Sequence, residues 1–450
     1  MLRSHRALLL AGLLLGPATW ASAQAIRVPA EWEPQEALWL QWPGPFEKTY
    51  EPAFAQITRI VSGYQPLHIL HNTNAVRNQA RAAITLVGGD PDHPNITWHA
   101  IPNQNAWMRD NGPVYVLSDG ALRIQDWEFD AWGGAFGNIP HASDDAVPTA
   151  VANYLGMPVD PVNIVHERGN LEFNGVDTVI LNWNVINDPG RGNNYPDKAA
   201  AEADLMGLFG VDKVVWADGP ISGDLTGGHI DGFARFIDAG RVVIGNCTNN
   251  SHCKPGDPDD QVFDATALAA SAAGFEVLRM DFQAEITHAG FSFDANYMNW
   301  GVGNGWVILV GFGNPQTDNA AKAQVEQWFP GRDVHVVEML DSWVEGGGVH
   351  CHTNDQPALP AAPVEIPASS QRGILLLVLA LLFAGAGLIL RARAGSRPVL
   401  QPPGAWGGLA RVRMKTTRSR IRASERVPPQ AAMSGDFPTA VPPSAMTRKR

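Results

Sequence analysis

The chain has 450 residues, of which 45% are hydrophobic and 17% charged, a composition typical of a globular protein with a sizeable core. Its formal net charge is −12, yet residues 391–450 hold 13 Lys and Arg against two acids, so the rest of the chain is strongly acidic. An acidic body argues against nucleic-acid binding and favours cationic substrates.

Both ends of the chain differ from the body. Residues 1–23 have the charged, apolar and small-residue order of a cleaved secretory signal peptide. Residues 373–390 are apolar and uncharged, which predicts a transmembrane helix. The Arg-rich residues 391–450 predict a basic, disordered tail in the cytoplasm, and the Pro- and Ala-rich residues 358–372 predict a linker. We therefore expect an exported, membrane-anchored protein whose functional domain, residues 26–357, lies on the periplasmic or extracellular face.

Segments of strand and helix character alternate within this domain. Runs rich in Val and Ile, bounded by Gly, Asn or Asp, predict β-strands at Leu122–Phe129, Thr178–Trp183, Lys213–Trp216, Arg241–Gly245, Gly305–Val310 and Asp333–Met339. Helices are expected at Pro52–Ser62, Ala146–Leu155, Pro196–Phe209, Ala265–Ala273 and Asn319–Phe329. The alternation predicts the α/β class, but no sequence repeat defines how the units are arranged.

The most informative stretch is Gly346–Pro357, which reads GGGVHCHTNDQP. Three consecutive glycines are unfavourable inside a strand or helix, so another group is expected to approach this backbone closely. Cys351 follows them, and a thiol beside small residues is a candidate nucleophile. A plain turn with a buried free cysteine is the structural alternative. A zinc site using His350 and His352 is less favoured, because the two would point to opposite sides of a strand and no CxxC pair completes a tetrahedral site.

The other two cysteines support a chemical role for Cys351. Cys247 and Cys253 are close in sequence, in NCTNNSHC, and an oxidising compartment would favour a disulfide between them. This pairing leaves Cys351 as the odd thiol. An unpaired thiol outside the cytosol is easier to understand if it takes part in chemistry.

Two stretches place carboxylates next to glycine turns. WMRDNGPVYV, at Trp107–Val116, puts Asp110 where a loop meets a strand, and HERGNLEFN, at His166–Asn174, carries Glu167. An ion pair between Arg109 and Asp110 that only fixes a turn is the alternative for the first of these motifs.

Two further stretches add an imidazole and an amide. GGHIDGFARF, at Gly227–Phe236, spaces His229 and Asp231 two residues apart, so in an extended segment both face one side. Together they would supply a proton shuttle and an anionic anchor, although a surface His and Asp in a glycine loop is equally compatible with this motif. In NYMNWGVGNG, Asn299 offers an amide to a site or caps a turn.

A thiol, an imidazole and several carboxylates together favour a cationic substrate. In a cysteine peptidase, surplus carboxylates would repel the negative charge that develops on the substrate. A guanidinium reverses this argument, because its paired N–H groups bind carboxylates, its charge lowers the pKa of a nearby thiol, and its central carbon is electrophilic. The residue set therefore predicts attack on arginine-like compounds.

The chain resembles the agmatine deiminase and bacterial peptidylarginine deiminase family of the guanidino-group-modifying (pentein) superfamily. The resemblance covers about residues 29–357 and is carried, in family order, by PAEWEPQEALWLQWP, WMRDNGPVYV, DWEFDAWGG, ERGNLEFNG, GGHIDGFARF, NYMNWGVGNG with FGNP, and GGGVHCHTNDQP. It implies a five-bladed α/β propeller of ββαβ units whose blades each bring one or two residues to a central site.

The resemblance also implies residue roles. Cys351 is the nucleophile, His229 the general acid and base, and Asp110 and Asp231 the guanidinium anchors, whereas Glu167, Asn299 and Trp107 line the substrate site. The implied reaction is hydrolysis of agmatine or peptidylarginine through a covalent thiouronium intermediate, with release of ammonia and without a metal or cofactor. The expected partner is a small guanidino compound or an arginine-containing peptide, with membrane attachment through the C-terminal helix and no nucleic acid.

Two departures from the family pattern concern the part of the substrate that lies beyond its guanidinium group. The third motif reads FDAWGGA where FNAWGGK is more usual, and Arg168 replaces a glycine after Glu167. Arg168 would either pair with Glu167 or face a substrate carboxylate. Two other functions stay open at this point, namely transfer of the amidino group to an amine and non-catalytic binding of cationic ligands at a cell surface.

Overall fold

The computed structural model of the protein describes residues 26–359, and one ββαβ unit recurs five times within them. Each unit has an antiparallel pair of strands, then a helix, then a strand parallel to the second member of the pair. Parallel neighbours require such a crossover connection, which accounts for the helix between them. In one unit the first strand comes from the opposite end of the domain, since β19 (Thr353–Pro357) pairs with β2 (Gln35–Gln41).

The sheets have two to four strands. The first four-stranded sheet, in spatial order, is β19, β2, β3 (Leu67–Leu70) and β4 (Ile96–His99). The second is β1 (Ile26–Arg27), β5 (Val114–Ser118), β6 (Ala121–Glu128) and β7 (Val159–Val165).

The three-stranded sheets are β10 (Lys213–Ala217), β9 (Thr178–Asn182) and β8 (Glu172–Phe173); β11 (Ala234–Asp238), β12 (Arg241–Asn246) and β13 (Glu276–Asp281); and β16 (Gly301–Gly303), β17 (Trp306–Gly311) and β18 (Asp333–Glu338). A hairpin of β14 (Glu285–His288) and β15 (Phe291–Asp294) stands apart from them.

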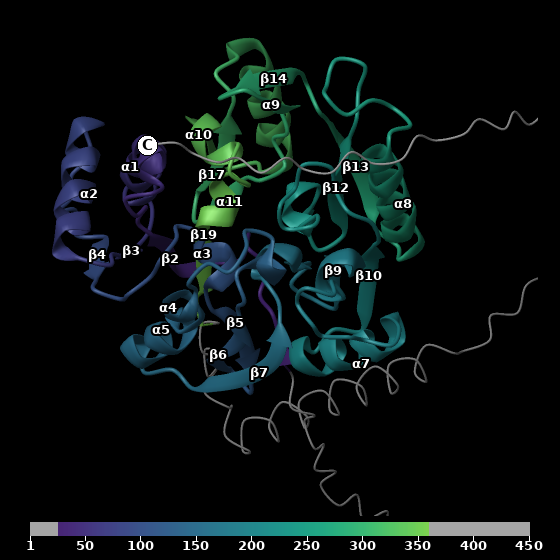
Figure 1. Ribbon diagram of the computed structural model, residues 1–450, viewed down its shortest axis with the longest axis horizontal. Helices are drawn as coiled ribbons and strands as arrows, with labels where there is room; N and C mark the ends of the chain where they lie inside the picture. Colours follow the sequence, from purple (N-terminus) through teal and green to yellow (C-terminus); the bar gives the residue numbers. More distant parts are fainter. Residues whose placement is uncertain (1–25, 360–450) are drawn as a thin grey trace, which may run out of the picture. The chain divides into compact units, whose positions relative to one another are not determined.

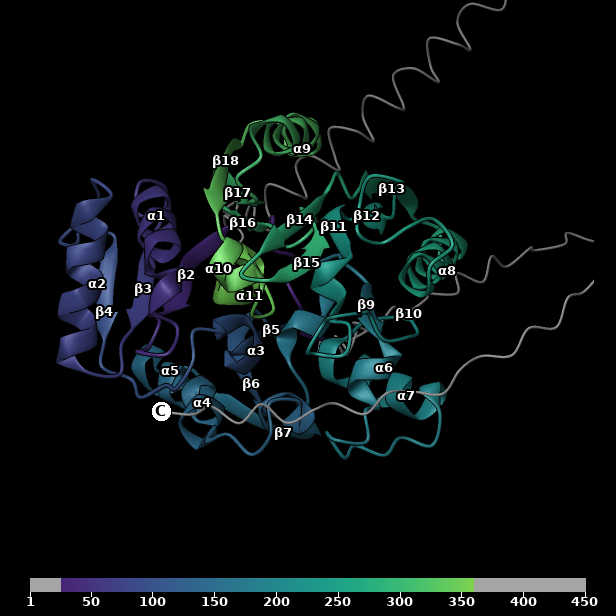
Figure 2. The same ribbon diagram turned by 45° about the horizontal axis from the view of Figure 1, so that its top comes forward.

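The longer helices lie at the periphery of the ring of sheets (Figures 1 and 2). They are α1 (Glu51–Val61), α2 (Asn74–Leu86), α5 (Val147–Leu155), α7 (Lys198–Phe209), α8 (Pro258–Ala272) and α9 (Pro315–Trp328). The short helices α3 (Met108–Asn111) and α11 (Val349–His352) lie near the centre in both views. The remaining short helices are α4 (Ala142–Asp145), α6 (Trp183–Ile186) and α10 (Leu340–Trp343).

Local sequence signals fix several of these elements. The Asp197 side chain accepts a hydrogen bond from the Ala200 N–H and so caps the start of α7, which ends at Gly210 with a φ of +66°. A Cβ at Gly210 would lie 1.9 Å from the Ile26 carbonyl oxygen, so this close approach requires glycine. All six residues of β17, WVILVG, are buried, because the strand is central in its sheet and is covered on both faces.

The strands and helices expected from the sequence are present, with ends that differ by a few residues, except that α8 begins at Pro258 rather than Ala265. The sequence did not predict β1 to β4, β7, β11, β13 to β16, β19, α2 or the short helices, whereas β5 was expected as the strand after Asp110. Several of these strands are short or carry charged residues, which weakens the Val- and Ile-rich signal on which the prediction depended.

The prediction of a membrane-anchored protein requires correction. Within residues 26–359, the structure has no helix with both the length and the apolar character needed to cross a membrane. The segment that carried the expectation, residues 373–390, lies outside the described residues, as do the expected signal peptide, the linker beyond residue 359 and the tail. The predicted transmembrane helix and anchored localisation are therefore withdrawn.

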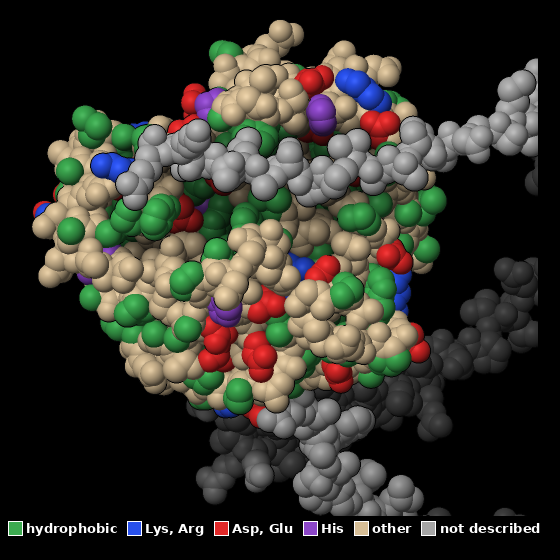
Figure 3. Space-filling model, in the orientation of Figure 1, with side chains coloured by type: hydrophobic (Ala, Val, Ile, Leu, Met, Phe, Trp, Pro, Cys, Tyr) green, Lys and Arg blue, Asp and Glu red, His purple; other side chains and the backbone are tan. Residues whose placement is uncertain are grey.

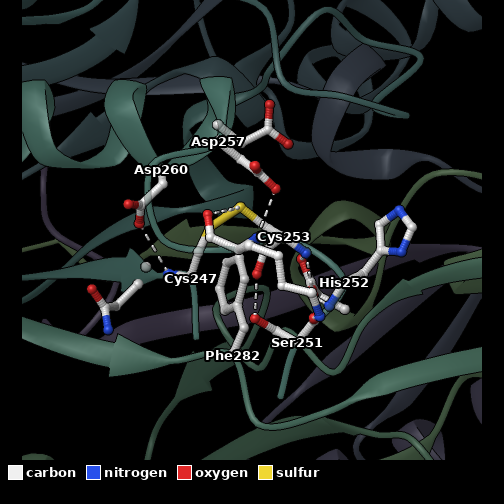
Figure 4. Close-up of a disulfide and its surroundings, with 12 residues drawn as sticks. Cys247, Ser251, His252, Cys253, Asp257, Asp260 and Phe282 are labelled. Carbon is white, nitrogen blue, oxygen red and sulfur yellow. Dashed lines mark hydrogen bonds between the residues drawn. A yellow bond between two sulfur atoms is a disulfide. The ribbon is translucent and has the colours of Figure 1, made fainter. Parts of the chain in front are cut away.

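The expected disulfide is confirmed. Cys247 and Cys253 are bonded, with their Cα atoms 5.3 Å apart, and Phe282 lies beside the bridge (Figure 4). Asp260 at the start of α8 accepts a hydrogen bond from the Cys247 N–H. On the other side, Asp294 at the end of β15 accepts one from the Cys253 N–H at 3.2 Å. The bridge thus ties α8 and the β14–β15 hairpin to one loop.

Candidate active site

The glycine run places Cys351 in the tightly packed centre of the domain. Cys351 lies in α11 and is 5% exposed. A Cβ at Gly347 would lie 2.5 Å from Cys351 Sγ and 2.9 Å from the Trp107 ring, and one at Gly348 would lie 2.2 Å from the Val310 side chain. The segment therefore requires glycines because neighbouring atoms leave no room for a side chain. The same run becomes a helical turn at Cys351, not the strand considered above.

Asn299 holds the nucleophile from the loop before β16. Its Oδ1 accepts hydrogen bonds from the N–H groups of Gly348, at 3.0 Å, and Cys351, at 3.2 Å. Because two donors fix the oxygen, the amide nitrogen must face the other way. There Nδ2 donates to Cys351 Sγ at 3.1 Å. Asn299 thus presents a donor that stabilises a thiolate.

His229 lies between two carboxylates. Its Nε2 is 3.3 Å from Glu167 Oε2, and its Nδ1 is 3.5 Å from Asp110 Oδ1. Burial alone would lower the pKa of His229, but Asp110 and Glu167 raise it to about 9. The imidazole is therefore protonated at neutral pH, the state that a general acid needs.

His229 and Asp231 do not lie in the expected extended segment. His229 precedes a 3-10 turn at Ile230–Gly232, which contains Asp231. Both side chains nevertheless face the site, since Asp231 Oδ2 accepts from the Cys351 thiol at 3.4 Å. His229 and Asp231 thus face the same site, as expected, but they do so from a 3-10 turn and not from the extended strand on which the expectation rested.

Asp110 reaches the site from α3, and Trp132 orients it. Trp132 Nε1 donates to Asp110 Oδ2 at 2.8 Å, whereas Oδ1 has no hydrogen-bond partner among the described residues. Burial, with help from Asp231 and Glu167, raises the pKa of Asp110 to about 7. Arg109, proposed as an alternative partner for Asp110, instead donates to Asp355 Oδ1 at 2.9 Å. A buried oxygen without a donor is suited to bind a cation's N–H group.

Glu167 is paired with a residue that the sequence analysis did not identify. Arg191 Nε lies 3.0 Å from each Glu167 oxygen. Burial alone would raise the pKa of Glu167, but Arg191 and His229 lower it to about 2. Arg168 does not pair with Glu167 and does not line the cavity described below, because it donates to both oxygens of Asp355. Both roles considered for Arg168 are therefore wrong.

A buried ion-pair network lies behind the nucleophile. His350 Nδ1 is 2.6 Å from Asp231 Oδ2, and its Nε2 contacts Glu31. Arg235 donates to Glu31 Oε2 at 2.6 Å and to Glu172 Oε2 at 3.0 Å. Among the described residues, Glu31, Glu172 and His350 are spaced as a metal site would be, but Arg235 already forms an ion pair with both carboxylates and Arg109 forms a second one with Glu31. The members of this network all lie in motifs quoted above, but these motifs are far apart in the chain, so the sequence did not predict their contacts.

The thiol is neutral in this environment. Burial raises the pKa of Cys351 well above its usual value, and Asp231 and Asp110 raise it further. The hydrogen bond from Asn299 acts in the opposite direction. A positive charge placed between these carboxylates would lower the pKa of the thiol.

A cavity of about 310 Å³ reaches the nucleophile and is lined by Cys351, His229, Asp231 and Asn299. The cavity also has phenylalanine walls and three further carboxylates, and the described residues that line it include no Lys or Arg. These further carboxylates belong to Asp224, Asp259 and Asp294. The face shown in Figure 3 likewise has more acidic than basic side chains in view. The site therefore favours cations.

The other three predicted site residues do not line this cavity. Asp110 and Glu167 lie against His229, while Trp107 packs on His352 with ring centroids 4.2 Å apart. Trp107 lines a neighbouring cavity of about 670 Å³ instead. The glycine backbone at Gly346 and Gly347 passes beside its ring and separates the two cavities.

Comparison with known proteins places this chain in a family. A family model described as Porphyromonas-type peptidyl-arginine deiminase matches residues 27–357. An agmatine deiminase from Pseudomonas fluorescens is 27% identical over 370 residues, which cover 75% of this chain and 96% of that protein.

Solved structures agree. An agmatine deiminase from Enterococcus faecalis superposes with a TM-score of 0.66 at 25% identity, over 75% of this chain and 97% of that one. A substrate-bound agmatine deiminase from C. jejuni has the same fold, with a TM-score of 0.66 at 19% identity, over 75% of this chain and 98% of that one. The resemblance seen in the sequence is confirmed: this chain belongs to the Porphyromonas-type peptidyl-arginine deiminase family and is a hydrolase that acts on linear amidines.

Proposed function

We propose that this enzyme hydrolyses the guanidinium group of agmatine-like substrates to a ureido group and ammonia, with Cys351 as nucleophile. The observation that carries the proposal is the arrangement around Cys351 Sγ, which lies 3.4 Å from Asp231 Oδ2 and accepts a hydrogen bond from Asn299 within a cavity that also reaches His229. Asp110 and Asp231 bind the guanidinium N–H groups, and Glu167 supports His229 from behind.

Substrate binding generates the nucleophile. The guanidinium brings a positive charge next to Asp231 and Asp110, the two carboxylates that raise the pKa of Cys351. The thiol then loses its proton to solvent, so the buried charge stays constant as the substrate enters. Asn299 Nδ2 stabilises the resulting thiolate.

His229 serves both halves of the reaction. The thiolate attacks the guanidinium carbon, and protonated His229 gives its proton to the departing amino group, so that ammonia leaves and a covalent thiouronium remains. Neutral His229 then takes a proton from a water molecule as that water attacks the same carbon. Cleavage of the C–S bond restores the thiolate, and the hydroxyl oxygen loses its proton to solvent as it becomes the carbonyl of the ureido product.

The cavity lining favours a substrate without a carboxylate. Asp224, Asp259 and Asp294 are part of this lining, and Arg168, considered above as a partner for a substrate carboxylate, is held by Asp355. An α-carboxylate there would meet like charges, whereas an ammonium group would be attracted. We therefore infer that agmatine is preferred over free arginine.

The test offers agmatine, free arginine and a C-terminal-arginine peptide separately to the full-length protein and to its Cys351→Ala variant. Ammonia and ureido product are measured, with and without an added amine acceptor. We expect turnover of agmatine, a lower kcat/KM for arginine, and no turnover by the variant. If the amidino group is transferred to the added amine and no ammonia is released, the enzyme is a transferase and not a hydrolase. A higher kcat/KM for the peptide than for agmatine would overturn the inferred preference for agmatine. Inactivity of the folded protein with a reduced Cys351 toward all three substrates would overturn the proposed hydrolase function.

A further inference from the structure

His350, like His229, has a carboxylate at each ring nitrogen and lies next to the nucleophile, yet the mechanism above does not use it. Its side chain is completely buried. Nδ1 lies 2.6 Å from Asp231 Oδ2, and Nε2 contacts Glu31 Oε1. The same Asp231 oxygen lies 3.4 Å from Cys351 Sγ. His350 therefore fixes the Asp231 oxygen that contacts the reacting sulfur.

The contacts define the protonation state of the ring. An ionised carboxylate only accepts hydrogen bonds, so a nitrogen that faces one has to donate. Two such nitrogens require an imidazolium, because neutral imidazole has a single N–H. Glu31, on the far side of the ring, is also bound by Arg109 and Arg235, which fix its position. Its contact with Nε2 therefore holds the imidazolium in place.

We propose that His350 is a positioning residue, a buried imidazolium that keeps Asp231 ionised and aimed at the substrate's guanidinium. This inference rests on the proposed function. Asp110 provides an internal comparison, because it is also a buried anchor of the same site and has the His229 imidazolium 3.5 Å from one oxygen, but it receives its one hydrogen bond from the neutral Trp132. Burial raises the pKa of Asp110 to about 7, whereas the hydrogen bond and charge of His350, together with the charges of His229 and Arg235, outweigh burial and lower the pKa of Asp231. Without the hydrogen bond and charge of His350, the pKa of Asp231 would rise toward that of Asp110.

Two amide substitutions separate the two contacts of the ring. In His350→Asn the amide nitrogen can take the place of Nδ1 and still donate to Asp231. In His350→Gln the amide nitrogen takes the place of Nε2 and reaches Glu31 only. The pair is matched in charge and differs by one methylene, so it isolates the hydrogen bond to Asp231.

The readout is the pH dependence of agmatine binding, measured by calorimetry between pH 5.5 and 8.5 in full-length protein that carries Cys351→Ala. With His350 present, Asp110 is the guanidinium anchor that titrates near 7, and Asp294 in the cavity lining titrates near 6 in every variant, so between pH 6 and 7 the affinity should fall about tenfold per pH unit. In His350→Gln a second carboxyl titrates in the same range, and the fall should approach about 100-fold per unit, with recovery above pH 8. His350→Asn should keep the shallower slope.

Each result decides the inference. A uniform loss of affinity at all pH values in both variants would mean that His350 only supports the fold, and an unchanged slope in His350→Gln would also overturn the proposal. Absence of agmatine binding at every pH with His350 intact would instead refute the proposed function. If neither variant folds, neutron diffraction from the unaltered protein decides the question. Deuterium on both ring nitrogens of His350 is expected, and an unprotonated Nδ1 would contradict the role.

Discussion

Replacing Asn299 by Asp tests how the thiolate is stabilised. The substitution is isosteric, and the remaining oxygen at the Oδ1 position still accepts from the N–H groups of Gly348 and Cys351. What changes is the atom 3.1 Å from Cys351 Sγ, which turns from an N–H donor into an acceptor. The variant therefore removes one hydrogen bond to the sulfur while it preserves the glycine segment.

The expected loss can be worked from that contact. A hydrogen bond to a charged group contributes about 1.5–3 kcal/mol. At about 1.4 kcal/mol per factor of ten, its loss lowers kcat/KM roughly 10- to 150-fold. The new carboxylate adds a like charge beside the sulfur and raises the thiol pKa further, so the observed loss should not fall below this range.

Two assays report on this effect. The first is kcat/KM for agmatine from ammonia release, and the second is the pH dependence of iodoacetamide alkylation. Alkylation reports on Cys351 alone, because the chain has three cysteines and the other two form the disulfide. We expect the alkylation profile of Asn299→Asp to move to higher pH.

Asn296→Asp is the matched control. Asn296 lines the same cavity, and its amide donates to the Gly232 carbonyl oxygen rather than to the sulfur. This control adds the same charge close to the site but leaves the donor to Cys351 in place. Equal alkylation profiles and equal kcat/KM values for the two variants would refute the role of Asn299.

Three further predictions concern pH, the disulfide and the glycine run. Because the thiol also releases its proton when substrate binds, kcat/KM for agmatine should rise with pH, more steeply below about pH 7 where Asp110 also ionises, and should level off above about pH 9 as His229 loses its proton; a profile that keeps rising past pH 9 would contradict His229 as the acid. Changing both Cys247 and Cys253 to Ser should lower the free energy of unfolding by about 2 kcal/mol, because the bridge closes a short loop; an unchanged urea midpoint would contradict this. Gly347→Ala places a methyl group 2.5 Å from the sulfur and should reduce kcat/KM by roughly 100-fold, whereas full activity in a folded variant would show that the segment can move aside.

The sequence was informative about chemistry because chemistry depends on residue types. Cys351, His229, Asp110, Asp231, Glu167 and Asn299 were all identified from motifs, and the structure brings the nucleophile, the imidazole and their polar neighbours together. The α/β alternation was also visible, since central strands such as β9 and β17 are buried on both faces and so must be apolar.

Pairing partners could not be read from the sequence. Arg168 follows Glu167 in the chain yet binds Asp355, whereas Glu167 is neutralised by Arg191, which is 24 residues away. Adjacent residues commonly point in different directions, so sequence proximity is a poor guide to ion pairs. Trp107 shows the same limit, since its ring lies behind the glycine backbone in a separate cavity.

The sequence by itself therefore determined the α/β class, the family, the disulfide and the set of reactive groups, because each depends on local pattern and residue type. Only the tertiary structure decided the pKa values and the partners of those groups. These depend on burial and on charges a few ångströms away, and the ring of five ββαβ units brings such charges from distant segments to one centre.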